Sequence, residues 1–371
     1  MTTHAPSSVI ATSPAATAWS RWSRFRRWFA EAVRGQGLLH GTWSRSTGLL
    51  VATLALVAIA LASLLIGNER LSLHEVHAAY FAYTGSDTDL IVLHLRVPRT
   101  LVGLAVGMAL GIAGMLVQGV TRNPLGGPGI LGINAGAALA AVVAISIFGA
   151  TAVIGYVWFA FLGAALAAVV VYAVGSIGAG GASPVKLALA GAAVTAMLGS
   201  VTSAIILRDR ASLDEYRFWV VGSLGGADTA MLGHALPFIA LGVLLAVALT
   251  RPLNALAMGD DLARSLGVRL GIVRALGGVA VVLLAGTATA AAGPIGFVGL
   301  AVPHIARAIA GPDYRWILPW SAVLAPALLL AADILGRVIA RPEELQVGIV
   351  TALVGAPVFI YLVRRKRLAG L

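Results

Sequence analysis

Residues 49–66 read LLVATLALVAIALASLLI and contain no charged side chain. A helix needs about 20 predominantly apolar residues to cross the roughly 30 Å hydrocarbon core of a bilayer, so this stretch predicts a membrane span. Nine further stretches of comparable composition follow it along the chain. We therefore expect ten spans, placed near residues 49–66, 100–119, 130–150, 152–175, 187–207, 231–250, 275–293, 295–310, 317–335 and 347–363.

The composition of the whole chain agrees with this reading. Of its 371 residues, 59% are hydrophobic and only 11% are charged, a balance that soluble proteins do not have. We expect an all-α polytopic membrane protein with one continuous membrane domain over residues 49–371. Residues 1–48 form a basic and aromatic tail, in which WSRWSRFRRWFAEAVR (19–34) is either an interfacial amphipathic helix or a frayed basic segment.

The formal net charge of +11 is explained by membrane topology rather than by a nucleic-acid partner. If both termini are cytoplasmic, most of the 26 lysine and arginine residues, including RRKR at 364–367, lie in cytoplasmic segments. An excess of basic residues marks the cytoplasmic loops of membrane proteins. The sequence therefore predicts a multi-pass protein of the inner (plasma) membrane with both termini, and the tail 1–48, in the cytoplasm.

The chain lacks the residue patterns of an enzyme or of an ATP-binding subunit. Neither of its two lysines, Lys186 and Lys366, follows a glycine, so no phosphate-binding GxxxxGK[ST] loop is present. Cysteine is absent, which excludes thiolate metal sites and thiol nucleophiles. Carboxylates and histidines that could relay protons are nearly absent from the spans, where His304 and Asp333 stand alone. We expect no catalytic residue, no metal and no cofactor held by this chain.

Glycines 103, 107 and 111 recur at every fourth position of the second span. Small residues at that interval let two helix backbones approach closely, either inside one chain or between two chains. We favour packing inside the chain.

A polar insertion, RPLNALAMGDDLARSLGVRLGIVR (251–274), lies between the sixth and seventh spans. Asp260 and Asp261 favour the start of a short helix, because acidic side chains stabilise its positive end. Gly267 favours the end of that helix. The insertion is either a solvated connector or a handle by which a cytoplasmic partner moves the bundle.

Several long motifs, in order along the chain, resemble those of a known protein family. The insertion 251–274 and these motifs are similar to segments of the iron–siderophore/cobalamin (FecCD-type) permease family, the ten-span membrane subunits of type II ABC importers; Gly126-Gly127 departs from the usual pattern. The motifs are RVPRTLVGLAVGMALGIAGMLVQGVTRNPLGGPGILGINAGA (96–137), SPVKLALAG (183–191), GPIGFVGLAVPHIAR (293–307), DYRWILPWSAVLAPALLLAADILGRV (313–338) and LVGAPVFIYLVRRK (353–366).

The resemblance implies an extracytoplasmic solute-binding protein whose acidic residues dock on permease arginines, which match Arg96, Arg99 and Arg337 here. Two arginines beside Pro98 also predict a cationic rim for carboxylates. The alternative is that they are interfacial arginines whose heads only reach toward water.

The resemblance also implies that the insertion enters a groove of a cytoplasmic ATPase pair, which binds the ATP. The residues assigned to this coupling role are Gly259, Asp260, Asp261, Leu262, Ala263, Arg264, Ser265, Leu266 and Gly267.

For the inner gate, the resemblance points to Ser183 and Pro184, although a helix cap followed by a first-turn proline explains them equally well. Candidate pathway residues are polar side chains within the spans, each of which could instead bond to a neighbouring helix. They are Gln118, Asn134, Thr195, Thr202 and Ser203.

We therefore expect a permease subunit of an ABC importer for ferric siderophores, with a second permease chain completing the conduit as a heterodimer (favoured) or a homodimer. Haem and cobalamin are alternative solutes. An ion-driven secondary transporter is a more distant alternative, because it would need charges near the membrane midplane.

Overall fold

The computed structural model describes residues 37–150, 153–178, 183–208, 216–217 and 219–368. Within these ranges the chain is helical, apart from one isolated bridge between Ile66 and Arg70. The expected interfacial segment 19–34 lies outside the described residues. The elements are α2 (Thr42–Leu65), α3 (Leu73–Phe81), α4 (Asp87–Leu90), η2 (Ile91–Arg96), α5 (Val97–Thr121), η3 (Pro128–Leu131), α6 (Ile133–Phe148), α7 (Val153–Ser176), α8 (Pro184–Ile206), α10 (Thr229–Ala257), α11 (Asp260–Ser265), α12 (Leu270–Val281), η4 (Val282–Gly286), α13 (Thr287–Ala292), α14 (Val298–Ala310), α15 (Tyr314–Ile339) and α16 (Val347–Leu368).

Each of the ten expected spans coincides with helix in the described residues. In the part of the chain that the structure describes, seven helical segments are long and apolar enough to cross a membrane. The remaining three expected spans coincide with the shorter apolar helices Ile133–Phe148, Val298–Ala310 and Val347–Pro357. The all-α membrane fold is therefore confirmed, and the count of ten crossings stays a prediction.

Helix α5 is the centre of the bundle, and its glycines explain why. Gly103, Gly107 and Gly111 all face α15, where an added Cβ would collide with Leu330, Pro326 or Ala325. Close backbone approach of this kind is the usual role of small residues in membrane helices. The expectation that these glycines pack inside the chain is confirmed.

The helical segment that contains α5 also starts earlier than the sequence predicts. A continuous helical segment of 35 residues runs from Asp87 to Thr121, through the π-helical turn η2. This wider turn directly precedes Pro98, whose missing N–H and bulky ring disfavour an ordinary α-helical turn. The stretch before residue 100, which contains His94 and Arg96, is therefore part of the same helical segment as the second span.

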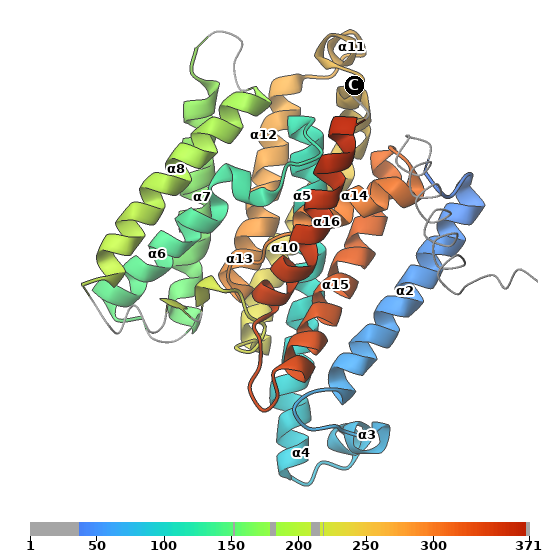
Figure 1. The fold of residues 1–371 in the computed structure, drawn as a ribbon, viewed down its shortest axis with the longest axis vertical. Coiled ribbons are helices and arrows are strands. Elements are labelled where there is room, and N and C mark those ends of the chain that lie inside the picture. The colour runs from blue at the N-terminus through green and yellow to red at the C-terminus, as the bar shows by residue number, and fades with distance from the viewer. Residues whose placement is uncertain (1–36, 151–152, 179–182, 209–215, 218, 369–371) are drawn as a thin grey trace, which may run out of the picture.

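The bundle has two distinct ends (Figure 1). We call them the α3 end, where α3 and α4 project at the bottom of the view, and the α11 end, at the top. Helix α2 begins and α16 finishes at the α11 end. Helix α2 starts at Thr42, several residues before the expected span. Just before it, the amide groups of Leu38 and Leu39 donate to the carbonyl group of Ile309 in α14.

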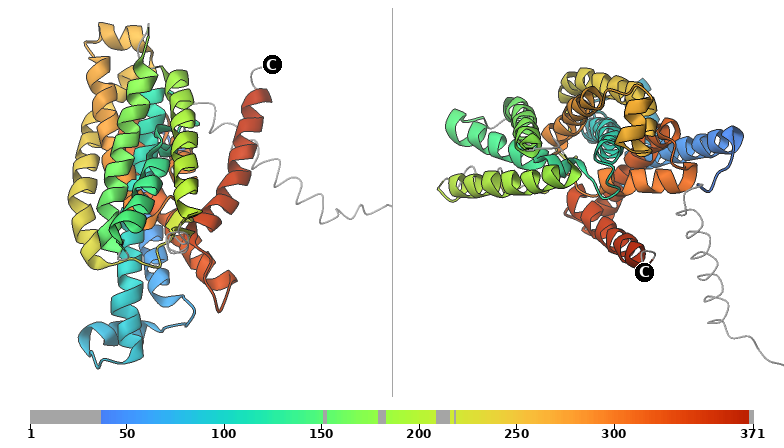
Figure 2. Two further views of the ribbon diagram at one scale, coloured as in Figure 1. Left: turned by 90° about the vertical axis from the view of Figure 1, so that its left-hand side faces the viewer. Right: turned by 90° about the horizontal axis from the view of Figure 1, so that it is seen from above.

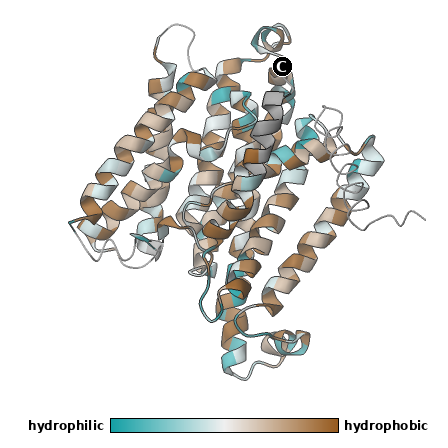
Figure 3. Ribbon diagram, viewed as in Figure 1, coloured by the Kyte–Doolittle hydropathy of each residue, from teal (hydrophilic) through white to brown (hydrophobic). Residues whose placement is uncertain are grey.

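The flanks of the bundle carry apolar side chains that no other part of the described chain covers. Figure 2 shows α6, α7 and α8 on one flank, α2 on the opposite flank, and α16 standing away from one face. In the most apolar stretch of α2 only 6% of the residues are buried. Figure 3 shows hydrophobic residues along this helix and hydrophilic ones in the turn between α15 and α16. These exposed apolar flanks suit contact with lipid or with another chain.

Candidate functional site

The three arginines expected to dock a partner lie at the α3 end, where two of them pair with one carboxylate. Arg99 stands in the first turn of α5 and Arg337 in the last turn of α15. The Arg99 Nη2 atom lies 2.8 Å from Asp333 Oδ1, and the Arg337 Nη2 atom lies 2.9 Å from Asp333 Oδ2. A second carboxylate, that of Glu344, lies 2.6 Å from Arg99 Nη1. We call Arg96, Arg99, Arg337, Asp333 and Glu344 the arginine cluster.

Most of the arginine cluster is buried. Asp333 is fully buried, and Arg337 is 2% and Arg96 6% exposed. The Arg96 guanidinium donates to the carbonyl groups of Leu64 and Glu69. Within the chain these guanidinium groups are occupied by carbonyls and carboxylates, because burying an unpaired charge costs far more than pairing it. A cationic rim that docks a partner's carboxylates stays a prediction.

A shallow recess of about 380 Å³ opens over the arginine cluster. Arg96, Arg99, Arg337 and Glu344 all line it, together with the turn around Asn68. Of the two acids, Glu344 is the accessible one, with 35% of its side chain exposed. The recess thus presents one partly exposed carboxylate on one nearly buried arginine.

The sequence reasoning missed the two acids of the arginine cluster. Asp333 and Arg337 are four residues apart on α15, a spacing that places them on one face of a helix and could have revealed the pair. Glu344 follows α15 in the turn toward α16, and no local spacing connects it with Arg99.

At the α11 end, the polar insertion forms the expected short helix. Helix α11 spans Asp260–Ser265 with both acids in its first turn. Gly267 follows it with φ of 81°, a left-handed conformation that favours glycine. The amide groups of Gly267 and Val268 bond to the carbonyl groups of Arg264 and Ala263 and so close the helix. The expected start and end of this helix are confirmed.

Helix α11 is tied to the bundle through Asp260. Its Oδ2 atom lies 2.8 Å from Arg274 Nη2 on α12, and its Oδ1 atom lies 3.3 Å from Arg122 Nη2, just after α5. Burial raises the pKa of Asp260, but the hydrogen bond and charge of Arg274 and the charges of Arg122 and Arg264 outweigh burial and leave the pKa below its ordinary 3.8. The sequence reasoning did not single out Arg122 or Arg274.

The outer face of α11 is available to a partner. Leu262 is 48% exposed and Leu266 is 58% exposed, and Ser265 is exposed as well. Arg264 pairs with Asp261 at 2.8 Å on the surface of the helix. Ala263, in contrast, is fully buried and fixes the inner face. One face of this short helix is therefore anchored, and the other presents two leucines.

The expected gate residues begin α8. The Ser183 side chain accepts a hydrogen bond from the Lys186 amide at 3.3 Å, and Pro184 occupies the first turn. This geometry is that of an ordinary helix cap. A gating role for the pair stays a prediction.

The expected pathway residues are divided between two parts of the bundle. Gln118 is buried between α5 and α14, donating to the Leu300 carbonyl at 3.1 Å and accepting from Arg307 at 3.3 Å. Asn134 accepts from Thr289 at 3.2 Å and lines a recess beside Leu300. The other three lie on α8: Thr202 is buried and bonds to its own helix, while Thr195 and Ser203 are exposed.

Comparisons with known proteins agree with the fold and with the motifs. The sequence model of the FecCD transport family matches residues 54–365. The chain is 47% identical over 327 residues to the ferric enterobactin transport system permease protein FepD of Escherichia coli, covering 87% of this chain and 96% of that protein. It is 42% identical over 304 residues to a probable siderophore transport system permease protein, YfiZ of Bacillus subtilis, covering 82% and 91%.

A solved structure also has this architecture. It is described as an inward-facing conformation of a metal-chelate type ABC transporter, and it matches with a TM-score of 0.75 and 28% sequence identity. The match covers 86% of this chain and 99% of that one. From its motifs, its helices and these matches, the chain is a multi-pass membrane protein that belongs to the FecCD transport family.

Proposed function

We propose that this chain is the permease subunit of an ABC importer and forms part of the translocation path for ferric siderophores. The single observation that carries this proposal is the 47% identity to a ferric enterobactin permease over nearly its full length. The long apolar helices packed around α5 supply the bundle that such a path requires. Haem or cobalamin is the alternative solute within the same family.

The proposal includes a division of labour among subunits. A second permease chain, in a heterodimer rather than a homodimer, completes the path formed by residues 49–371. A cytoplasmic ATPase pair binds and hydrolyses ATP, so this chain carries no catalytic residue and no cofactor of its own. The protein lies in the inner membrane with both termini, and the basic tail 1–48, in the cytoplasm. In this orientation the α11 end is cytoplasmic and the α3 end faces outward.

Helix α11 is the proposed contact with the ATPase. A handle must be held firmly by the part it moves and must present a surface to the part that drives it. Asp260, paired with Arg274 and Arg122, provides the first property. The exposed Leu262 and Leu266 provide the second, because the buried core of a protein interface is more apolar than its rim.

The arginine cluster is the proposed seat of the solute-binding protein, with Arg99 as the accessible arginine. Its side chain is 12% exposed and already holds Glu344. An incoming carboxylate would replace Glu344 there, while Asp333 keeps Arg337 and Arg99 in place from beneath. Arg337 then acts by joining the outer end of α15 to that of α2, and Arg96 by joining the start of α5 to α2, rather than by touching the partner.

Two sets of residues are proposed to line the path itself. The wall residues within α5 and α6 are Gln118 and Asn134, and those on α8 are Thr195, Thr202 and Ser203. The proposed gate residues, at the start of α8, are Ser183 and Pro184. The exposed face of α8 suits a path that a second permease chain closes.

Uptake measurements test the proposed solute. Cells lacking their own siderophore permeases should accumulate iron from a labelled ferric catecholate siderophore when they express this chain with its partner subunits. Unlabelled siderophore should compete, and haem and cobalamin should not. Uptake of haem or cobalamin without iron–siderophore uptake would contradict the proposed solute and favour the alternative.

Site-directed cross-linking tests the proposed ATPase contact, and the absence of cysteine from the chain gives a clean background. Leu262→Cys and Ser265→Cys should cross-link to the ATPase subunit in the assembled complex. Phe81→Cys, on the 80% exposed Phe81 of α3, is the matched control and should not. Free labelling of residues 262 and 265 by a water-soluble maleimide in the intact complex would contradict the contact.

A further inference from the structure

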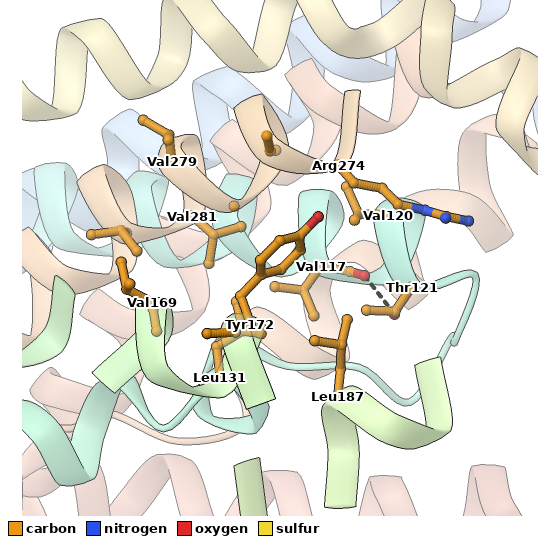
Figure 4. A pocket seen from close by; sticks show the side chains of 16 residues that line it. Val117, Val120, Thr121, Leu131, Val169, Tyr172, Leu187, Arg274, Val279 and Val281 are labelled. Atoms are coloured by element: carbon orange, nitrogen blue, oxygen red, sulfur yellow. Dashed lines mark hydrogen bonds between the residues drawn. The ribbon is translucent and has the colours of Figure 1, made fainter. Parts of the chain in front are cut away.

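A recess of about 270 Å³ lies between α5, α7 and α12 and is lined by none of the residues of the arginine cluster or of α11. Apolar side chains make up most of its lining (Figure 4), among them Val117, Val120, Leu131, Leu187 and Val281. The recess opens to the surroundings at its edges, because Val169 is 64% exposed and Val279 is 50% exposed. It is thus a side pocket in the flank of the bundle, next to the hydrocarbon of the membrane.

One end of this recess is polar and positively charged. The Arg274 side chain borders it from α12, and the Tyr172 hydroxyl points toward the side on which Arg274 lies (Figure 4). Arg122 follows directly after Thr121, another lining residue. The two guanidinium groups share the single carboxylate of Asp260, so one positive charge at this end is not balanced by that acid. Arg122 is also 40% exposed along its side chain.

An apolar recess with a positively charged end matches one kind of molecule in its surroundings. A membrane phospholipid supplies an acyl chain for the apolar part, and an anionic headgroup supplies the negative charge that Asp260 alone does not provide. We propose that this recess binds an anionic phospholipid from the leaflet at the α11 end, with its acyl chain among α5, α7 and α12 and its phosphate beside Arg122 and Arg274.

This site is coupled to α11 through a shared side chain. Arg274 borders the recess with its aliphatic stem and holds Asp260, the first residue of α11, with its guanidinium. A bound acyl chain supports that stem, and a phosphate competes with or reinforces the Asp260 contact. Lipid binding therefore changes how firmly α11 is held. This consequence for coupling rests on the proposed function, whereas the binding itself does not.

Two glycines of α12 allow a matched test of binding. A Cβ at Gly278, which lines the recess, would meet no atom within 4 Å, so Gly278→Leu fills the recess without a clash at its base. A Cβ at Gly271 also meets nothing within 4 Å, but Gly271 does not line the recess. Because both glycines lie in α12, the two leucine substitutions have comparable effects on the helix itself.

The assembled complex is reconstituted in vesicles with a photoreactive phosphatidylglycerol, and labelled peptides are identified by mass spectrometry. We expect labelling of α12 and α7 peptides in the unaltered protein, at least a fivefold loss in Gly278→Leu, and no loss in Gly271→Leu. Equal labelling in both variants would overturn the site. Cross-linking of these peptides to the second permease chain instead of lipid would overturn it as well, since a protein helix would then occupy the recess.

A headgroup comparison tests the charged end independently of the glycine variants. Photoreactive phosphatidylcholine should label the same peptides several-fold more weakly than phosphatidylglycerol, and Arg122→Gln should remove that difference. Equal labelling by the two lipids in the unaltered protein would overturn the anionic preference. ATP hydrolysis of the complex in vesicles with and without phosphatidylglycerol then tests the coupling separately. Lipid labelling that is specific for the recess but leaves hydrolysis unchanged would overturn only the effect on α11.

Discussion

The two ends of the bundle use the same chemistry, arginine against carboxylate, in opposite surroundings. At the α3 end, Asp333 is fully buried between Arg99 and Arg337, and its pair with Arg99 joins the end of α15 to the start of α5. At the α11 end, Asp260 is partly exposed and holds a six-residue helix. Buried ion pairs are costly to break, while exposed ion pairs contribute little to stability. The ion pairs at the α3 end therefore hold the helices of the bundle rigidly together, whereas the ion pairs of α11 hold it more weakly.

The largest expected effect comes from removing the carboxylate of Asp333 at the α3 end. Asp333→Asn leaves the buried Arg337 guanidinium without its counter-charge and Arg99 with Glu344 alone, and should lower the free energy of unfolding by about 3–5 kcal/mol. Thermal unfolding of the purified protein in detergent measures this loss. The control is Asp261→Asn at the other end, where the Asp261 side chain is fully exposed and little change is expected. Equal stability of the two variants would show that the buried ion pairs of Asp333 do not stabilise the α3 end.

The next largest effect concerns the C-terminal end of helix α11. Gly267 has φ of 81°, so Gly267→Ala places a Cβ in the left-handed conformation and should cost about 1–2 kcal/mol locally. Gly271→Ala, a few residues along in α12, should instead stabilise by about 0.5 kcal/mol. Hydrogen exchange of the α11 amides should rise in the first variant and stay unchanged in the second. Unchanged protection in Gly267→Ala would contradict the cap geometry.

A smaller effect concerns the ion pairs of Asp260, which attach α11 to the bundle, and it makes the stability of the protein depend on pH. Asp260→Asn removes the contacts with Arg274 and Arg122 and should cost about 1 kcal/mol, since the site is partly exposed. The pKa of Asp260 is lowered in the folded protein, so its contribution is complete above the ordinary value of 3.8 and is lost as the pH falls below it. Unfolding measured between pH 6 and pH 3 should therefore show a loss of stability in the unaltered protein that Asp260→Asn lacks. Parallel pH profiles would contradict the role of this pair.

The smallest effect sharpens the comparison at the α3 end. Glu344→Gln removes the accessible acid on Arg99 without disturbing Asp333 and should strengthen binding of the solute-binding protein by two- to fivefold, about 0.5–1 kcal/mol. Glu343→Gln changes the neighbouring acid and should leave the affinity unchanged. Binding to the complex in nanodiscs measures both. Weaker binding in Glu344→Gln would mean that Glu344 itself contacts the partner.

Much of the fold follows from the sequence because membrane helices carry a strong local signal. The apolar stretches, the packing glycines at 103, 107 and 111, and the start and end of α11 are all properties of neighbouring residues. The early start of the second span was missed, because the expected span covers only the apolar stretch from residue 100 onward. In the folded protein, Arg96 in the preceding stretch donates to the carbonyl groups of Leu64, at the end of α2, and of Glu69.

The candidate site was harder to predict because burial and pairing belong to the tertiary structure. The sequence brought Arg96, Arg99 and Arg337 together by resemblance, but it could not show that carbonyls and carboxylates already occupy them. Arg99 and Glu344 are 245 residues apart, so only the folded chain brings them together. The same holds for Arg122 and Arg274, which meet only at Asp260.

Transport by purified components tests the central claim most directly. In vesicles containing this chain with its second permease chain, the ATPase pair and the solute-binding protein, uptake of labelled ferric siderophore should require ATP and persist when the proton gradient is collapsed. The two permease chains without the ATPase should transport none. Accumulation driven by an ion gradient in the absence of the ATPase would contradict the account.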